Sequence, residues 1–299
     1  MIIFGTAITS AEQHERFAAP GIARVREPDS KIFAHQTTGS VFRNYNLMLD
    51  LARDEPDLEA LVIVHQDTEM LEDPEFGSKI RAALADPDVA IIGCVGAIGV
   101  RSIAWWQGAV TWASFIHRYE ELGGGEVTAM TFSDDTTPLF AELGEVDSID
   151  GFLMVLSPWA VRNLRFDESL GRLHGYDFDI CCQARAAGKK VVTANLKAIH
   201  HHSLDLISDP DTWTEAYIRI AEKWDGQLPH GDQGTDDWRA LSIRAQAESA
   251  CAMGQATSYE LKYHAALGLV KEMENSTSWR LTKPLRAAGR LFRRRSKTA

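Results

Sequence analysis

The chain has 299 residues, of which 45% are hydrophobic and 24% charged, a balance that excludes general intrinsic disorder and suffices for one large domain with an appendage. Its formal net charge is −11, so we expect no nucleic-acid partner, because an acidic surface repels phosphate groups.

The first part of the chain alternates short, β-branched apolar runs with stretches of helical periodicity. This alternation predicts βαβ units, and therefore an α/β fold with a mostly parallel sheet flanked by helices. We expect strands at residues 2–6, 22–25, 60–64, 89–93, 149–156, 190–194 and 198–202. We expect helices at residues 41–51, 74–84 and 176–187, and a helical pattern from about residue 208 to the end. The predicted division is an α/β domain at 1–207, a helical extension at 208–275 and a basic amphipathic tail at 276–299.

A histidine and a carboxylate follow the apolar run 60–64, in the order His65, Gln66, Asp67. Ligands of open α/β sheets bind at the carboxyl ends of the strands. A carboxylate in this place can hold Mg²⁺ or Mn²⁺ together with a diphosphate, since these ions combine one or two carboxylates with phosphate oxygens. The alternative is that Asp67 caps the turn that follows.

Two acids, Asp177 and Asp179, stand at the start of the helix predicted from residue 176. Acidic residues favour helix amino termini, which accounts for one of them. The other is a candidate general base for removing a proton from a hydroxyl group.

Three consecutive histidines, His200, His201 and His202, end the last predicted strand. Because successive side chains of a strand point to opposite faces, at most two of them share a face. One of them is a candidate metal ligand, and the alternative is a hydrogen-bonded side chain without a metal.

Several segments together resemble the inverting GT-A glycosyltransferases, of the family 2-like kind, and especially bacterial members of the streptomycin-biosynthesis glycosyltransferase group. The resemblance spans most of residues 1–203. It is carried by residues 39–46 and 61–67, and by an ordered succession: Asp-Gly-Phe-Leu-Met at 150–154, Tyr-Asp-Phe-Asp at 176–179, a helix closing in Ala-Gly at 187–188, and His-His-Ser at 201–203.

The resemblance implies a GT-A, Rossmann-like fold and transfer of a sugar from a nucleotide-diphosphate sugar to a hydroxyl acceptor on a glycan, lipid-linked or protein-linked molecule. It implies a divalent cation, Mn²⁺ or Mg²⁺, bound by Asp67, although His65 replaces the first acid of the family's Asp-x-Asp motif. It implies that Asp177 is the catalytic base, with Asp179 as its rival. His201 is the implied metal-binding histidine, with His200 and His202 as alternatives.

The resemblance also places further residues around the substrates. Those implied at the nucleotide sugar are Thr6, Glu27, Gly39, Asn46, His65 and Gln66. Those implied where acceptor and donor sugars meet are Trp105, Trp106, Asp150 and Gly151. Two other functions stay open on the sequence alone, a sugar-phosphate nucleotidyltransferase and a non-catalytic carbohydrate-binding protein on the same fold.

The tail from Ser276 onward carries arginines and lysines and no acidic residue. Apolar Leu285, Ala288, Leu291 and Phe292 share one face of a helix that could begin near Pro284. Such a helix is typical of proteins that lie on an anionic membrane surface, and the alternatives are a solvated tail or a helix docked on the protein itself. The longest apolar run, 89–100, is too short to span a bilayer, and no signal peptide is recognisable at the start. We therefore expect a cytoplasmic protein, with the inner membrane face as a second, peripheral location.

Overall fold

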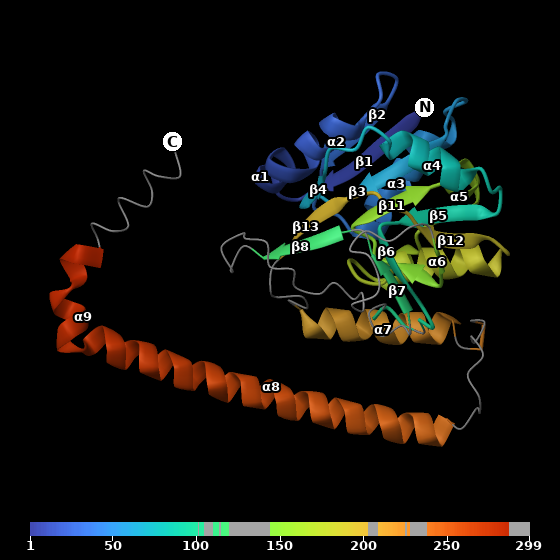
Figure 1. Cartoon of the computed structure of the whole chain (residues 1–299). Coiled ribbons are helices and arrows are strands. Elements are labelled where there is room, and N and C mark those ends of the chain that lie inside the picture. Colours follow the sequence, from blue (N-terminus) through green and yellow to red (C-terminus); the bar gives the residue numbers. More distant parts are fainter. Residues whose placement is uncertain are drawn as a thin grey trace. The chain divides into compact units, whose positions relative to one another are not determined.

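The structure is a computed structural model that describes residues 1–100, 102–104, 110–113, 115–119, 144–202, 209–224, 226–227 and 238–286. It divides into two compact units, Met1–Gly231 and Asp232–Ala299 (Figure 1). The first unit takes in a helix beyond residue 207, so the functional division at that residue remains a prediction.

A seven-stranded sheet forms the centre of the first unit, in the order β2-β1-β3-β11-β5-β12-β9 (Figure 1). The strands are β1 (Ile2–Ile8), β2 (Lys31–Gln36), β3 (Ala60–Val64), β5 (Val89–Gly93), β9 (Gly144–Val146), β11 (Leu153–Leu156) and β12 (Lys190–Thr193). Strand β11 runs antiparallel to both of its neighbours and β9 antiparallel to β12, whereas the other pairs are parallel. All residues of β3 and β5 are buried, as expected for strands covered on both faces. The mostly parallel sheet predicted from the sequence is confirmed.

Helices pack on this sheet: α3 (Val41–Arg53), α4 (Phe76–Leu84), α5 (Pro158–Asn163) and α6 (Tyr176–Ala186). Serine side chains cap two of them, since Ser40 accepts the Arg43 amide of α3 and Ser157 accepts the Ala160 amide of α5. Helix α3 packs against β1, β3 and α5. The helices expected at 41–51, 74–84 and 176–187 are therefore present, with ends that shift by a few residues.

The strand expected at residues 22–25 is wrong, because this segment belongs to helix α2 (Ala19–Val25). It continues from α1 (Ala11–Gln13) and the π-helical turn η1 (His14–Ala18). Ala18, Ile22 and Val25 are buried with the spacing of one helical face. The neighbouring strand is instead β2, whose residues are all exposed or partly exposed, as fits an edge of the sheet.

Two small sheets lie beside the central one. One has the order β10-β6-β7, with β6 (Val95–Ile98), β7 (Val110–Ala113) and β10 (Ser148–Ile149), and the other has the order β4-β13-β8, with β4 (Thr68–Met70), β8 (Phe115–Tyr119) and β13 (Ala198–His202). The strand expected at 149–156 is thus two strands, β10 and β11, separated by Asp150, Gly151 and Phe152. This interruption creates a loop at the end of the sheet.

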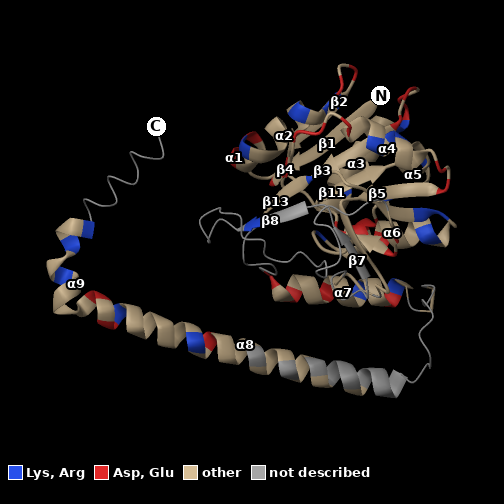
Figure 2. Cartoon of the chain, in the orientation of Figure 1, with Lys and Arg blue, Asp and Glu red and all other residues tan. Residues whose placement is uncertain are grey.

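Helix α7 (Pro210–Trp224) completes the first unit and buries Ala216, Ile220 and Trp224. The second unit contains α8 (Trp238–Asn275) and α9 (Thr277–Leu281). Charged residues of both signs occur along the described part of α8, whereas the one charged residue of α9, Arg280, is basic (Figure 2). Among the described residues, no helix is both long and apolar enough to cross a membrane.

Candidate active site

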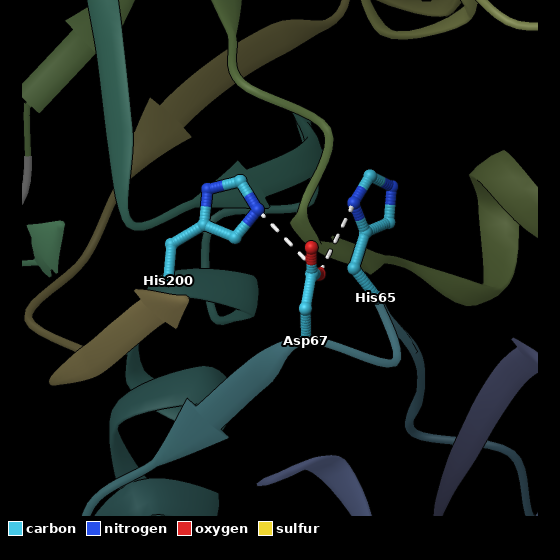
Figure 3. Close-up of side chains that lie close together, drawn as sticks. All are labelled: His65, Asp67 and His200. Carbon is cyan, nitrogen blue, oxygen red and sulfur yellow. Dashed lines mark ion pairs between the residues drawn. The ribbon is translucent and has the colours of Figure 1, made fainter. Parts of the chain in front are cut away.

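The carboxyl end of β3 leads directly into a group of polar side chains. His65, Gln66 and Asp67 form the turn between β3 and β4, and the Thr68 amide donates to the His65 carbonyl at 3.1 Å. Strand β13 then runs antiparallel to β4, with His200 opposite Thr68. The pairing of these two short strands brings His200 to Asp67, although they are far apart in the sequence (Figure 3).

The three side chains converge on one point (Figure 3). His200 Nε2 lies 3.5 Å from Asp67 Oδ1, and His65 Nδ1 lies 4.0 Å from the same oxygen. One ligand atom from each of the three residues lies within 4.8 Å of the others, so the group could hold a metal ion. His200 is buried, whereas His65 and Asp67 are partly exposed, so the group opens toward solvent on one side.

His200 is fixed by its surroundings. Its ring stacks on Phe152, with ring centroids 4.4 Å apart and an interplanar angle of 14°. Burial lowers the pKa of His200, but the nearby Asp67 carboxylate outweighs this effect and holds the pKa above its usual value. The two residues therefore attract one another before any cation is bound.

His201 points away from this group, as the alternation of a strand requires. Its Nε2 lies 3.0 Å from Glu69 Oε2, and its ring stacks on Phe17 at 3.7 Å between centroids. The side chain of His201, the histidine preferred from the sequence, therefore points away from the Asp67 carboxylate, and the side chain of the alternative, His200, lies beside it. His202 is described only as a backbone position of β13.

The loop between β10 and β11 joins the histidines to the amino end of α6. The Phe152 carbonyl accepts the His65 amide at 2.9 Å, and Asp177 accepts the Gly151 amide at 3.0 Å. Asp177 also accepts the amide of Phe178 at 2.9 Å. Burial and then the charge of Asp150 raise the pKa of Asp177 to about 7, against the pull of these backbone hydrogen bonds.

Asp179 is occupied in the interior. Its Oδ1 accepts the Trp224 indole N–H at 2.8 Å and pairs with Lys223 Nζ at 2.8 Å, and its Oδ2 accepts from Gln183 at 2.7 Å. The side chain is 1% exposed. Asp179 thus fastens α7 to α6, while Asp177 is partly exposed beside Asp150.

Comparison with known proteins shows the family to which the chain belongs. The model of a family described as "Glycosyltransferase like family" matches residues 28–217. The streptomycin biosynthesis protein StrF of Streptomyces griseus is 30% identical over 204 residues, which cover 68% of this chain and 67% of StrF. The chain belongs to this glycosyltransferase-like family. The family match confirms the glycosyltransferase predicted from the sequence, and the structure confirms the predicted α/β fold.

Two solved structures are also similar in fold. A197 from STIV is 13% identical with a TM-score of 0.42, and the match covers 68% of this chain and 86% of that one. GalNAc-T7, crystallised with UDP, GalNAc and Mn²⁺, is 11% identical with a TM-score of 0.48. That match covers 78% of this chain and 52% of GalNAc-T7.

Two residues that the glycosyltransferase resemblance assigned to the nucleotide sugar, Gln66 and Asn46, hold the backbone in place. The side-chain Oε1 of Gln66 accepts the backbone amides of Thr9 and Ser10, each at 2.8 Å, and so binds the loop after β1. Asn46 exchanges two hydrogen bonds with the backbone of Phe166, at 2.8 and 3.0 Å. Gln66 therefore holds the loop after β1 to the turn after β3, and Asn46 holds α3 to the segment after α5.

Other assigned residues differ in their placement. The Gly39 amide donates to the Thr37 hydroxyl just before α3. Thr6 is fully buried in β1, and its hydroxyl has no hydrogen-bond partner within the described residues. Glu27 binds Arg81, which also binds Glu59 at the amino edge of the sheet, the edge opposite Asp67. Trp105 and Trp106 lie outside the described residues.

Sequence reasoning missed the aromatic residues that surround the histidines. Tyr176 Oη lies 2.8 Å from His65 Nε2, and its hydroxyl is also hydrogen-bonded to that of Tyr45. The sequence spacing of Tyr45 on α3 indicated only a buried helical face. The position of Tyr176 directly before Asp177 was the available signal, because a residue next to a candidate base lies near the reacting groups.

Proposed function

We propose that this glycosyltransferase-family protein transfers a sugar from a nucleotide-diphosphate sugar to an acceptor hydroxyl, with inversion at the anomeric carbon. One observation carries the proposal: His65, Asp67 and His200, which could hold a metal ion, are joined to the Asp150–Asp177 pair through one short loop at the carboxyl end of β3. A cation stabilises the negative charge that develops on the leaving group, and a carboxylate accepts the proton that the acceptor hydroxyl loses.

Asp67 and His200 would hold the divalent cation. The donor set fits, because a carboxylate oxygen and an imidazole nitrogen 3.5 Å apart are both ligands of Mn²⁺ in proteins. When bound, the cation supplies positive charge that stabilises the departing diphosphate. The aromatic ring of Phe152 holds His200 in the orientation that presents Nε2 to Asp67.

Asp177 would be the general base. Its pKa of about 7 is suited to accepting a proton near neutral pH, whereas an ordinary aspartate is too weak a base. The hydroxyl proton passes to the Asp177 carboxylate while the acceptor oxygen attacks the anomeric carbon and the bond to the diphosphate breaks. A single displacement of this kind inverts the configuration. Asp179 is held by Lys223 and Trp224, which leaves Asp177 as the base.

Binding of donor can be tested by thermal shift with a panel of nucleotide sugars, with and without Mn²⁺. A matching donor stabilises the folded protein by mass action, and we expect the shift to require Mn²⁺. The Asp67→Ala variant should lose this shift. Without donor, its melting temperature should equal that of the natural protein. His201→Gln is the matched control and should retain the shift, because His201 contacts Glu69. Donor binding by Asp67→Ala equal to that of the natural protein would refute the assignment.

We also propose that the acceptor is presented at an anionic membrane surface that the tail helps to bind. Support comes from the described start of the tail, residues 276–286. There Leu281 and Leu285 are 75% and 73% exposed, one helical turn apart, and Arg286 lies over the Trp279 ring. Apolar side chains next to basic ones are typical of helices that lie in a membrane interface.

A further inference from the structure

We propose that His65 is a third metal ligand, and that the set of His65, Asp67 and His200 selects transition-metal ions such as Mn²⁺ and Co²⁺ over Mg²⁺. The inference rests on the proposed function and deepens it, because it names the class of cation that the site accepts. It also assigns a chemical role to His65, which stands where the family's Asp-x-Asp motif has its first carboxylate.

The distances support a three-residue site. Metal–ligand distances of about 2.0 to 2.2 Å place neighbouring ligand atoms roughly 3 to 3.5 Å apart. His200 Nε2 and Asp67 Oδ1 are already 3.5 Å apart, and His65 Nδ1 is 4.0 Å from the same oxygen. All three ligand atoms lie within 4.8 Å of one another, so His65 Nδ1 would have to come closer to close the set around an ion.

The backbone on both sides of the turn is held before any ion binds. The His65 amide donates to the Phe152 carbonyl at 2.9 Å, and the His201 amide donates to the Asp67 carbonyl at 2.9 Å. One partner, Phe152, lies in the loop before β11, and the other, His201, lies on β13. The ligands are therefore preorganised, which reduces the entropy lost on metal binding.

Tyr176 orients His65 with its Nδ1 toward Asp67. The Tyr176 oxygen lies 2.8 Å from His65 Nε2, and the hydroxyls of Tyr176 and Tyr45 are hydrogen-bonded. If the Tyr176 hydroxyl donates to Tyr45, its oxygen accepts the Nε2–H of His65. In that tautomer the lone pair of Nδ1 is available to a metal, as in many metal sites where a second group fixes the ring.

Two imidazoles and one carboxylate make a donor set that Mg²⁺ disfavours. Mg²⁺ prefers oxygen ligands and keeps several waters, whereas imidazole suits transition-metal ions. For such a set, affinity rises from Mn²⁺ to Co²⁺. Replacing His65 by aspartate would restore an oxygen-rich pair with Asp67 and should favour Mg²⁺.

The test is calorimetric titration of the full, metal-free chain with Mn²⁺, Co²⁺ and Mg²⁺, first alone and then with a nucleoside diphosphate present. We expect Mn²⁺ to bind at least about tenfold more tightly than Mg²⁺, and Co²⁺ more tightly still. His65→Asp should narrow the ratio between Mn²⁺ and Mg²⁺ by at least about tenfold. His201→Gln, on the opposite face of β13, should leave both affinities unchanged.

A second variant guards against effects of misfolding. Tyr176→Phe removes the oxygen that accepts from His65 but keeps the ring, and should weaken Mn²⁺ binding about tenfold while the melting temperature of the metal-free protein stays close to the original. Equal affinity for Mn²⁺ and Mg²⁺, no Mn²⁺ binding, or an unchanged ratio in a folded His65→Asp variant would overturn the proposal. Selective Mn²⁺ binding without a response to any nucleotide sugar would instead refute the proposed function and leave the metal selectivity standing.

Discussion

The Asp177 carboxylate accepts a hydrogen bond from the Gly151 backbone amide at 3.0 Å. This bond joins the first turn of α6 to the loop between β10 and β11. The same loop carries Asp150, which raises the pKa of Asp177, and Phe152, which stacks on His200. The proposed base and the proposed metal site are therefore positioned by one short segment.

A first prediction concerns the pH dependence of catalysis. The pKa of Asp177 is raised to about 7, and the base must be deprotonated, so kcat/KM should rise with pH through an apparent pKa near 7. A rate profile measured from pH 5 to 9 with Mn²⁺ and saturating acceptor checks this. A profile that is flat across neutral pH would contradict the role of Asp177.

The contribution of Asp177 to the stability of the folded protein should decrease as pH rises, whereas kcat/KM should increase. Between the ordinary aspartate pKa and 7, the folded state binds a proton at Asp177 that the unfolded state has lost. The free energy of unfolding of the metal-free protein should therefore fall relative to the Asp177→Asn variant as pH rises from about 4 to 7. Urea unfolding of both proteins across this range measures the difference, and two parallel curves would show that the pKa is not raised.

Gly151 should not tolerate a side chain. A Cβ atom at this position would lie 2.6 Å from the Tyr176 hydroxyl oxygen, so Gly151→Ala must displace the Tyr176 ring and with it Asp177. We expect a loss of stability of about 1 to 3 kcal/mol and a larger proportional loss of kcat than of donor affinity. Gly188→Ala is no control, because its φ of +73° strains any side chain. Gly268→Ala on α8 meets no neighbouring atom and should leave activity unchanged.

Asp179 should matter for stability through its attachment of α7. Asp179→Ala leaves the Trp224 indole N–H without its acceptor and removes one partner of Lys223, at an expected cost of roughly 3 kcal/mol. Glu215→Ala, on the same helix, breaks only an exposed pair with Arg219 and should cost less than about 0.5 kcal/mol. Chemical denaturation of both variants compares the two. A loss of stability in Asp179→Ala as small as that in Glu215→Ala would show that the buried contacts of Asp179 contribute little to stability.

The membrane proposal predicts salt-sensitive binding to anionic vesicles. The full chain should co-sediment with anionic liposomes at low salt and less at high salt, and should not co-sediment with neutral liposomes. A chain truncated after Asn275 lacks the basic tail and should lose this binding. Equal sedimentation of the two chains, or none from either, would remove the tail from the account.

Much of the fold followed from sequence patterns. The fully apolar runs at 60–64 and 89–93 are the buried strands β3 and β5, and the capped run after Ser40 is α3. The strand predicted at 22–25 was wrong, because a short apolar run fits a strand and one turn of a buried helix equally well. Only the longer spacing from Ala18 through Ile22 to Val25 separates the two.

The sequence indicated which segments form the candidate site, but not the contacts between them. The strand-end position of Asp67 indicated a ligand site, since the carboxyl edge of a sheet is where ligands bind. Which histidine faces Asp67 depends on the register of β13 against β4, and a shift of one residue exchanges His200 for His201. Local sequence cannot fix that register. The contacts of Asp179 with α7 are likewise tertiary, and they distinguish it from Asp177.

The most direct test of the account is the turnover of Asp177→Asn with a matching nucleotide sugar, Mn²⁺ and acceptor. The amide keeps the shape of the carboxylate but cannot take the proton, so kcat should fall by at least about a hundredfold while donor affinity stays within about twofold. Release of nucleoside diphosphate at the rate of the natural protein would contradict the account. The account would also be contradicted if a stably folded Asp179→Asn variant showed a comparable loss of turnover while Asp177→Asn stayed fully active.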